Sequence, residues 1–332
     1  MPESPAEATS DYDSIDFFTD QSLVPDPYPY FDHLRAQCPV LKTDNYGVYA
    51  VTGYDEASVV YKDADLFSSC IAVGGPFPPL PFTPEGSDIT DQIAAHRDEF
   101  LMSEHMVTMD PPQHSRARSL LNRLLTPKRL KENEDFMWRH ADRALEPYLA
   151  AGGGEYIADF AQPFTLAIIA DLLGVPESDR AEFASKMSHQ NSGGGVGSTS
   201  TSSIGHSPLE YLYEKFSRYI SDRRANPRDD ALTEMANATF PDGSMPEVMD
   251  VVRIAANLYT AGQETTVRLL STALKLLAED PELQQLLRNE PERIPNFIEE
   301  ALRIESPVKG DFRLARRNTV VGGVNVPAGA TV

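Results

Sequence analysis

The sequence predicts a mainly α-helical fold with a small β subdomain, on three observations. From Pro112 to about Leu287, apolar residues recur mostly at the spacing of helices that bury one face. Within this region, Pro246 to about Leu277 predicts one unbroken helix of about 32 residues and ~48 Å, long enough to cross a whole domain. Shorter alternating patterns at Val40 to Gly53 and Thr319 to Val332 indicate strands near both ends of the chain.

The N-terminal part of the chain is expected to alternate short elements. The first twenty residues (1–20) are acidic and predict a flexible arm, and the rest of the chain (21–332) is expected to form a single domain. Asp26 begins a predicted helix that runs to about Gln37. The stretch Val40 to Gly53 predicts a hairpin, and Asp55 begins the next helix.

Two segments are expected to be irregular. Ile71 to Thr90 is rich in Pro and Gly, and its scattered Phe and Leu favour a packed loop that forms part of a pocket. Ser192 to Gly205 is low in complexity and is either a linker between domains or a mobile lid. We favour the lid because both flanking segments are helical. The remaining helices are expected at Pro112–Leu125, Pro127–Ala151, Ala161–Leu173 and Pro176–His189, with two more beginning at Pro281 and Pro291.

The composition excludes several classes of function. The net charge of -21 argues against a protein that binds nucleic acid, because phosphate contacts need a basic surface. No stretch approaches the ~18 uninterrupted apolar residues of a membrane span, and the acidic start lacks the pattern of a signal peptide. We therefore expect no membrane association and a cytoplasmic protein. Cys38 and Cys70 are too few for a disulfide framework and fit a reducing compartment.

The most informative motif lies in the middle of the long predicted helix, at Ala261–Thr266 (AGQETT). The Thr265 hydroxyl can donate to the carbonyl oxygen four residues earlier, which bends or widens a helix. Ala261 and Gly262 leave this point bare, so that a flat cofactor or dioxygen can approach, while Glu264 and Thr265 supply an acid and a hydroxyl for proton delivery. The alternative interpretation is an ordinary helix that happens to contain a Gly and a Thr.

Three further motifs stand around the central one in a fixed order. They are Asp110–Arg118 (DPPQHSRAR), Glu300–Arg303 (EALR) and Pro307-Val308 followed by Arg313. Together the motifs resemble the cytochrome P450 family, the heme-thiolate monooxygenases, and the resemblance covers nearly the whole chain. It implies the cytochrome P450 fold and heme b (iron protoporphyrin IX) as the cofactor.

The resemblance assigns roles to the central motif. In the family, the acid and alcohol protonate dioxygen at the heme so that the O–O bond cleaves, which makes Glu264 and Thr265 the expected catalytic residues. Glu replaces the commoner Asp at the first of these positions, a variation that the family also shows. Ala261 and Gly262 are expected to contact the cofactor.

The resemblance also assigns partners to the two heme propionates, which need charged, hydrogen-bonding groups once they leave water. His114 and Arg118 stand four residues apart and so project from one face of a helix. Arg313 would reach the same carboxylates from an extended segment, where Asp311 is placed to orient either that arginine or a protonated propionate. Taken singly, each cation is more often a surface charge or an ion-pair partner.

The Glu-x-x-Arg motif is weak by itself, because the chain contains it at Glu177, Glu290 and Glu300. Only Glu300 with Arg303 is followed by Pro-Val and a further arginine, as the family requires. The resemblance implies a structural role for this pair, in which it ties its helix to the region around the heme. The alternative is a surface ion pair worth well under ~1 kcal/mol.

The segment Ser115 to Lys131 contains six basic residues and no acid, in an otherwise acidic chain. Such a run is usually a solvated face. It also suits a docking patch for an acidic electron carrier that is steered by charge. Because soluble bacterial members of the family receive electrons from ferredoxins, we favour the patch.

The family's axial cysteine, on a glycine-rich loop downstream of all four motifs, is absent from this sequence. Cys38 and Cys70 lack the surroundings of that loop and are expected to be small buried apolar residues, so no metal ligand is assigned. The chain stops inside a predicted strand, VPAGATV, whose edge would be left unpaired. We therefore expect that this sequence is truncated before the ligand loop and that its fold is incomplete at the C-terminus. We expect the chain as given to be an inactive fragment.

The predicted activity of the whole enzyme is hydroxylation of a small apolar substrate with O2 and two electrons from a ferredoxin or similar donor. The substrate is expected to lie under the Ile71 to Met106 loop, the Ser192 to Gly205 lid and the Val308 to Phe312 segment. One alternative is a non-catalytic, degenerate relative that binds a ligand or a partner. Another is a relative that uses the heme for isomerisation or dehydration, against which the Glu264 and Thr265 pair argues.

Overall fold

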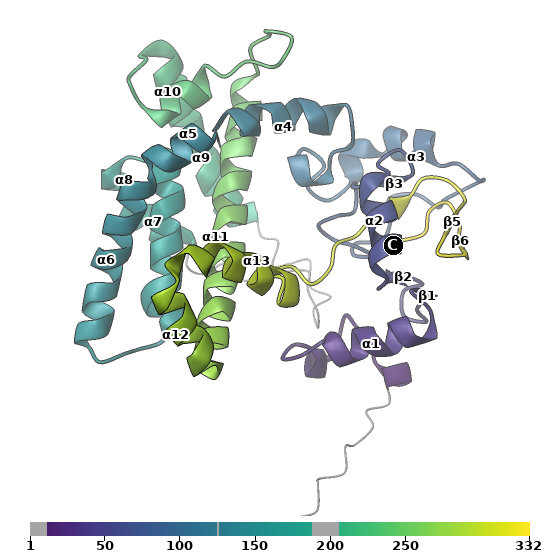
Figure 1. Ribbon diagram of the computed structural model, residues 1–332. Helices are drawn as coiled ribbons and strands as arrows, with labels where there is room; N and C mark the ends of the chain where they lie inside the picture. The colour runs from purple at the N-terminus through teal and green to yellow at the C-terminus, as the bar shows by residue number, and fades with distance from the viewer. Residues whose placement is uncertain (1–11, 125, 188–205) are drawn as a thin grey trace, which may run out of the picture. The chain divides into compact units, whose positions relative to one another are not determined.

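The computed structural model describes residues 12–124, 126–187 and 206–332. The chain divides into two compact units: unit 1 is Met1–Asp110 with Ser192–Ile204 and Gly310–Val332, and unit 2 is Pro111–Asn191 with Gly205–Lys309. The strands belong to unit 1, and unit 2 is built from helices (Figure 1). The predicted fold class, mainly α with a small β subdomain, is confirmed.

Unit 1 consists of short helices and two-stranded antiparallel sheets. The predicted hairpin pairs β1, Val40–Lys42, with β2, Tyr49–Val51. β3, Phe67–Ser68, pairs with β4, Leu314–Ala315, which brings a C-terminal strand against an early one. The other elements are α1 (Tyr28–Gln37), α2 (Tyr54–Lys62), α3 (Thr90–Ala95), the antiparallel pair β5 (Thr319–Val321) and β6 (Val324–Val326), and the 3-10 turns η1 (Tyr12–Ser14), η2 (Gln21–Leu23), η3 (Arg97–Glu99) and η4 (Met106–Thr108).

The early and late strands of unit 1 share one apolar core, in which Val40, Phe67 and Val326 are each 1% exposed. The end of the chain belongs to the same core. Val332 exchanges two backbone hydrogen bonds of 2.8 Å with Arg313, and the carbonyl oxygen of Thr331 accepts from the amide of Tyr49 at 2.8 Å. The expectation of an unpaired terminal strand is therefore wrong for these residues, because backbone partners far away in the sequence satisfy them.

Unit 2 is organised around α11, Val248–Glu279, a helix of 32 residues that contacts α4, α7, α9, α12 and α13. The helix begins with a capping box, in which the side chains of Glu247 and Asp250 each accept from the backbone of the other residue. Val252, Ala255 and Tyr259 are 0% exposed and fix the helix in the unit. Among the described helices, none combines the length and the apolar character that a membrane crossing requires.

The other helices of unit 2 follow the predicted pattern with few exceptions. They are α4 (Gln113–Leu124), α5 (Pro127–Glu132), α6 (Glu134–Ala150), the π-helical turn η5 (Ile157–Ala161), α7 (Gln162–Leu172), α8 (Glu177–Met187), α9 (His206–Ala225), α10 (Ala231–Ala236), α12 (Pro281–Asn289), the 3-10 turn η6 (Pro291–Arg293) and α13 (Ile294–Ile304).

The structure differs from the sequence-based expectation at two places. The helix predicted at Pro127–Ala151 is divided at Asn133 into α5 and α6, and Asn is one of the weaker helix formers. Within the predicted Ile71 to Met106 loop, α3 forms a helix too short to show a helical period in the sequence. Residues 1–11 of the predicted arm and the whole predicted lid at Ser192 to Gly205 lie outside the described residues.

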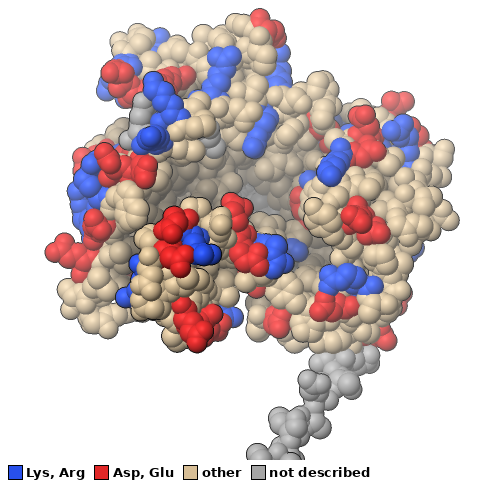
Figure 2. All heavy atoms as spheres, viewed as in Figure 1, with Lys and Arg blue, Asp and Glu red and all other residues tan. Residues whose placement is uncertain are grey.

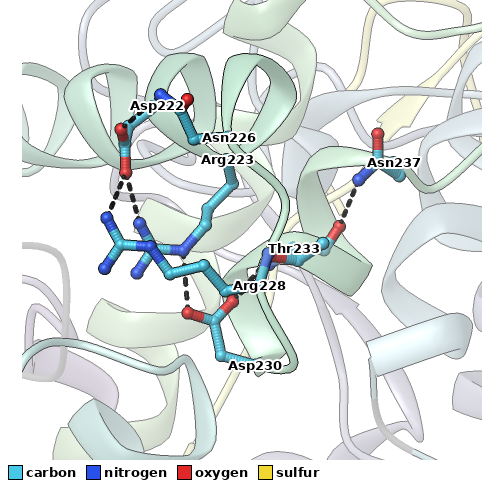
Figure 3. A network of polar contacts seen from close by, with 7 residues as sticks. All are labelled: Asp222, Arg223, Asn226, Arg228, Asp230, Thr233 and Asn237. Carbon is cyan, nitrogen blue, oxygen red and sulfur yellow. Dashed lines mark hydrogen bonds and ion pairs between the residues drawn. The ribbon is translucent and has the colours of Figure 1, made fainter.

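The corner between α9 and α10 is held by a polar network (Figure 3). Arg223, whose side chain is 8% exposed, pairs with Asp222 and donates from Nε to Asp230 at 2.7 Å. Asp230 also caps α10, because its carboxylate accepts from the amide and the hydroxyl of Thr233, both at 2.8 Å. Arg228 reaches Asp222 at 3.1 Å. A buried guanidinium is thus compensated by two carboxylates, one of which orders the next helix.

A stack of aromatic rings fills the interface of α6 with η5 and α7. The His140 ring lies nearly parallel to Phe136 at 5.7 Å and to Phe164 at 6.0 Å, and Phe164 in turn stacks on Phe160 at 5.5 Å. Burial lowers the pKa of His140 from its ordinary value of 6.5, and the positive charges of Arg143 and Arg180 lower it further, while Asp171 opposes the shift. The neutral imidazole is therefore the form that this packing favours.

Candidate functional site

The predicted central motif lies on α11, and three of its side chains share one face of the helix with Arg268. Ala261, Glu264, Thr265 and Arg268 follow one another at helical spacing; Glu264 is half-buried and the other three are exposed. On the opposite face, Gln263 and Val267 are buried. An acid, a hydroxyl and a small residue are thus gathered on the open face of the helix, in the middle of its length.

Thr265 forms the hydrogen bond that its position predicts. Its hydroxyl donates to the carbonyl oxygen of Ala261 at 2.8 Å. Thr260 and Ser271 make the same kind of bond, to Ala256 at 3.1 Å and to Val267 at 2.8 Å, so the bond alone does not distinguish Thr265. Thr265 differs from Thr260 and Ser271 in being exposed, whereas those two residues are half-buried. The helix remains α-helical throughout the motif and shows no widened turn.

Gly262 has a packing explanation in the structure. A methyl group built at this position would lie 3.1 Å from Cδ1 and 3.4 Å from Cγ1 of Ile169 on α7. Glycine therefore allows α7 and α11 to approach closely, since a real Cβ would force Ile169 to move. The predicted contact of Ala261 and Gly262 with a cofactor stays a prediction.

Glu264 is paired with Arg268, one turn later on α11. The same guanidinium donates from Nη1 to the carbonyl oxygen of Pro307 at 3.0 Å. Pro307 belongs to the Pro-Val motif that the sequence singled out, so two of the motifs meet through a residue that was not predicted. The spacing of Glu264 and Arg268, four residues apart on a helix, is the signal that could have identified the pair.

His114 and Arg118 project from α4, which packs against α11 within unit 2. His114 is half-buried and Arg118 is exposed. Within the described part of the chain, neither side chain forms a hydrogen bond or an ion pair. Two neighbouring cations without an internal partner are what an external anionic group requires.

Arg313 belongs to unit 1, where its side chain is 16% exposed. Its Nη1 donates to Asp311 Oδ2 at 2.8 Å and to the carbonyl oxygen of Phe312 at 2.7 Å. The guanidinium also lies 5.2 Å from the centre of the Tyr61 ring. The expected orientation of Arg313 by Asp311 is confirmed, whereas its contact with the anion of His114 and Arg118 stays a prediction.

Asp110, the first residue of the DPPQHSRAR motif, belongs to unit 1 and forms its bonds within that unit. Its carboxylate accepts from the Ser68 hydroxyl at 2.5 Å, from the Ser69 amide at 2.7 Å and from Arg316 at 2.6 Å. The side chains of Asp110 and Arg316 are only 13% and 12% exposed. This role was not predicted, because the partners are far from Asp110 in sequence and no local pattern reveals them.

Two of the predicted substrate-lining segments meet in unit 1. The ring of Phe312 lies 2.8 Å from the position that a Cβ on Gly75 would occupy, so a larger residue at position 75 would collide with the ring. Gly75 also has a φ of +58°, a backbone conformation that favours glycine. Phe77, also in the Ile71 to Thr90 loop, packs with Phe18, which stacks on Phe312 at 5.9 Å. A small hollow lies beside them, lined by residues that include Ile71, Phe77, Leu80, Phe100 and Leu101.

Two of the three Glu-x-x-Arg motifs form surface ion pairs. Glu300 and Arg303 on α13 make two hydrogen bonds, of 2.7 and 2.5 Å, with side chains 55% and 68% exposed. Glu290 and Arg293 form a similar exposed pair, and Figure 2 shows acidic and basic side chains adjoining over α12 and α13. The arginine after Glu177 pairs instead with Asp171 at 2.7 Å. The predicted structural role of Glu300 and Arg303 stays a prediction.

The basic segment Ser115 to Lys131 is partly committed to internal contacts. Arg116 pairs with Asp242 at 2.8 Å, donates to Ser244 at 3.0 Å and covers the Phe240 ring at 3.7 Å. Hydrogen bonds from Ser244, and then from Arg116, lower the pKa of Asp242 to about 2. Arg116 is therefore a structural residue, and among the described side chains Arg118, Arg123 and Lys131 remain for a docking surface.

The cysteines do not resemble metal ligands. Cys70 is 1% exposed, and burial raises the pKa of its thiol to about 11, so that it is protonated at neutral pH. The expectation of a buried cysteine is confirmed for Cys70 but not for Cys38, which is half-buried after α1. Among the described residues, no group of His, Cys, Asp and Glu side chains is arranged to hold a metal ion.

Known proteins resemble this chain over most of its length. A family model described as Cytochrome P450 matches residues 204–332. Cytochrome P450 144 of Mycobacterium tuberculosis is 31% identical over 322 residues, which cover 95% of this chain and 70% of the relative. Cytochrome P450 109 of Bacillus spizizenii is 29% identical over 310 residues, covering 92% of this chain and 69% of the relative.

A solved structure is more similar still. Cytochrome P450 CYP150A6 of Mycobacterium marinum, in its substrate-free form, superposes with a TM-score of 0.88 at 58% identity, covering 97% of this chain and 75% of that chain. These similarities place the fold in the class of heme-dependent monooxygenases. The chain belongs to the cytochrome P450 family.

The family implies a heme cofactor, and part of the site fits one. Heme carries carboxylates, and His114 with Arg118 offers two cations that make no internal bond. The exposed face at Ala261 and Thr265 adds a surface that a flat ring can approach. The axial ligand does not fit either cysteine of this sequence, because Cys70 is a buried thiol and Cys38 adjoins α1 and β1 in unit 1.

Proposed function

We propose that this chain carries the heme- and oxygen-handling residues of a monooxygenase that hydroxylates a small apolar substrate. The observation that carries the proposal is the open face of α11, where the half-buried Glu264 and the exposed Thr265 stand beside Ala261 in the middle of the helix. Buried Gln263 and Val267 lie on the other side of the helix, so the acid and the hydroxyl are left together on its open side. A proton-delivery site needs both.

His114 and Arg118 would hold the propionates of heme b from α4, and Arg313 would add a third cation, already oriented by Asp311. Bound heme would supply the iron at which dioxygen is reduced by two electrons, with one oxygen atom going to the substrate and the other to water. Ala261 and Gly262 would form the bare strip of α11 that faces the ring. Glu300 and Arg303 would act structurally, by tying α13 to the region around the cofactor.

The chemical contribution of the chain is proton delivery. The Thr265 hydroxyl, whose own hydrogen is directed to the Ala261 carbonyl, keeps its oxygen lone pairs available to orient a water molecule. The Glu264 carboxyl would take a proton from solvent, to which its side chain is 43% exposed, and pass it along that water. Two protons delivered in this way would accompany the two electrons to dioxygen, and the oxygen atom that does not enter the substrate would leave as water.

The apolar character of the substrate follows from the rings that meet in unit 1. Phe18, Phe77 and Phe312 pack together beside the small hollow, and the hollow is lined mainly by apolar and aromatic side chains. For the donor, we propose a ferredoxin or similar acidic carrier that docks on the basic segment Ser115 to Lys131 through Arg123 and Lys131. A cytoplasmic location agrees with such a donor.

The test is oxygen incorporation. The full-length enzyme, loaded with heme b and supplied with ferredoxin and its reductase, is screened against apolar compounds for a shift of the heme absorption band. Compounds that shift the band are then turned over under isotopically labelled O2, and one labelled oxygen atom should enter each product molecule. A protein that binds neither heme nor any compound would instead support the non-catalytic relative.

A further inference from the structure

Arg268 is engaged on two sides at once. One guanidinium nitrogen pairs with Glu264 on the preceding turn of α11, and the other donates at 3.0 Å to the carbonyl oxygen of Pro307. Pro307 lies beyond α13, so the arginine joins α11 to a segment 39 residues further along the chain. Both ends of this bridge lie in unit 2.

This arrangement differs from an ordinary surface ion pair. Arg218 and Glu214 on α9 have the same spacing of four residues, with side chains 69% and 59% exposed, and in the described part of the chain they bond only to each other. The side chains of Arg268 and Glu264 are less exposed, at 51% and 43%. The second guanidinium nitrogen of Arg268 also donates a hydrogen bond to the backbone carbonyl oxygen of Pro307. The planar fork of a guanidinium can hold two acceptors in fixed directions.

Resting on the proposed function of Glu264 and Thr265, we propose that Arg268 is a positioning residue for proton delivery. The Arg268 guanidinium binds the Glu264 carboxylate and the backbone carbonyl oxygen of Pro307 at the same time. It thereby holds the carboxylate in one orientation beside Thr265. The carboxylate is thereby linked to the segment 305–309, which leads into the predicted substrate-lining residues Val308 to Phe312.

The bridge requires the shape of arginine as well as its charge. A lysine at position 268 carries one compact ammonium on a flexible stem and cannot hold both acceptors in the directions that the fork gives. Arg268→Lys and Arg268→Met should therefore behave alike. If charge alone mattered, Lys would preserve the wild-type behaviour.

The experiment compares Arg268→Met and Arg268→Lys with the matched surface control Arg218→Met. Hydrogen-deuterium exchange of the peptide covering residues 304–312 is measured with and without heme, and it should rise in both Arg268 variants but not in the control. In the heme-loaded enzyme, product formed per reductant consumed should fall by about tenfold or more in both variants, with a larger solvent isotope effect. The KM for substrate should change by less than about twofold.

A double variant separates this inference from the proposed function. If Glu264→Gln lowers coupling, adding Arg268→Met should lower it no further, because the two residues act as one unit. Unchanged coupling in Glu264→Gln would overturn the proposed function itself. Normal coupling and exchange in Arg268→Met, together with impaired Glu264→Gln, would overturn only the role of Arg268, as would full activity in Arg268→Lys.

Discussion

The Thr265 hydroxyl donates to the carbonyl oxygen of Ala261 at 2.8 Å, on the exposed face of α11. Because no packing depends on this hydroxyl, Thr265→Ala should retain heme and substrate. Product formation should fall by about 10²–10⁴, the usual value of acid-base assistance, and the electrons should appear as hydrogen peroxide. Reductant consumed, peroxide formed and product formed are measured together.

Thr260→Ala is the control for this prediction. Thr260 makes the same kind of backbone bond but is half-buried, five residues earlier on the helix. It should keep wild-type coupling, and Thr265→Ser should recover much of it. Wild-type coupling in Thr265→Ala would mean that the motif is only a structural feature of α11.

Removing the proposed propionate partners should weaken heme retention. His114→Ala, Arg118→Ala and Arg313→Leu each deprive a carboxylate of a charge-assisted hydrogen bond worth about 1.5–3 kcal/mol. Heme content after gel filtration, and the rate of heme transfer to apomyoglobin, measure the loss. Arg123→Ala, on the same helix as His114, should retain heme normally. Equal heme retention in the three site variants and this control would remove those residues from the site.

The ring stack around His140 predicts a pH dependence of stability. The pKa of His140 is lowered in the folded chain from 6.5, so the unfolded chain binds more protons between the folded pKa and ~6.5. The contribution to stability is therefore complete above ~6.5 and is lost as the pH falls. Urea midpoints at about pH 7.5 and about pH 5.5 should differ less in His140→Phe than in the wild type. His33→Gln, which alters an exposed pair with Asp13, should leave the wild-type difference unchanged.

The polar corner of Figure 3 predicts a local loss of stability. Asp230→Ala removes both the cap of α10 and one partner of buried Arg223, and should cost about 2–4 kcal/mol of unfolding free energy. Asp230→Asn keeps a capping oxygen and should cost less. Asp229→Ala, at the exposed neighbouring position, should be nearly neutral. Chemical denaturation measures all three, and an equal cost for Asp229→Ala and Asp230→Ala would contradict the assignment.

The sequence was most informative where a pattern repeats many times. The central helix was predicted from Pro246 to Leu277 and is observed from Val248 to Glu279, because nine turns of apolar spacing average out local uncertainty. The Thr265 bond could also be predicted, since it depends only on helix geometry. The division at Asn133 and the helix α3 could not, because a single residue or six residues give too little periodic signal.

The contacts that join distant segments were beyond prediction from one sequence. The carboxylate of Asp110 meets Ser68 and Arg316, and Arg268 meets the backbone of Pro307, yet no local pattern relates these positions. The same limit explains the terminal residues. Their strand looked unpaired in the sequence because its partners, Tyr49 and Arg313, become neighbours only when the chain folds.

The contact between Gly262 and Ile169 constrains how this helix can change during evolution. A methyl group at position 262 would press on Ile169 of α7, so an enlargement there is best accommodated by a smaller residue at 169, such as Val. Positions 262 and 169 should therefore vary as a pair among relatives, although only one of them belongs to the central motif. The size of the α7 residue that faces α11 then limits which residues the central motif can contain.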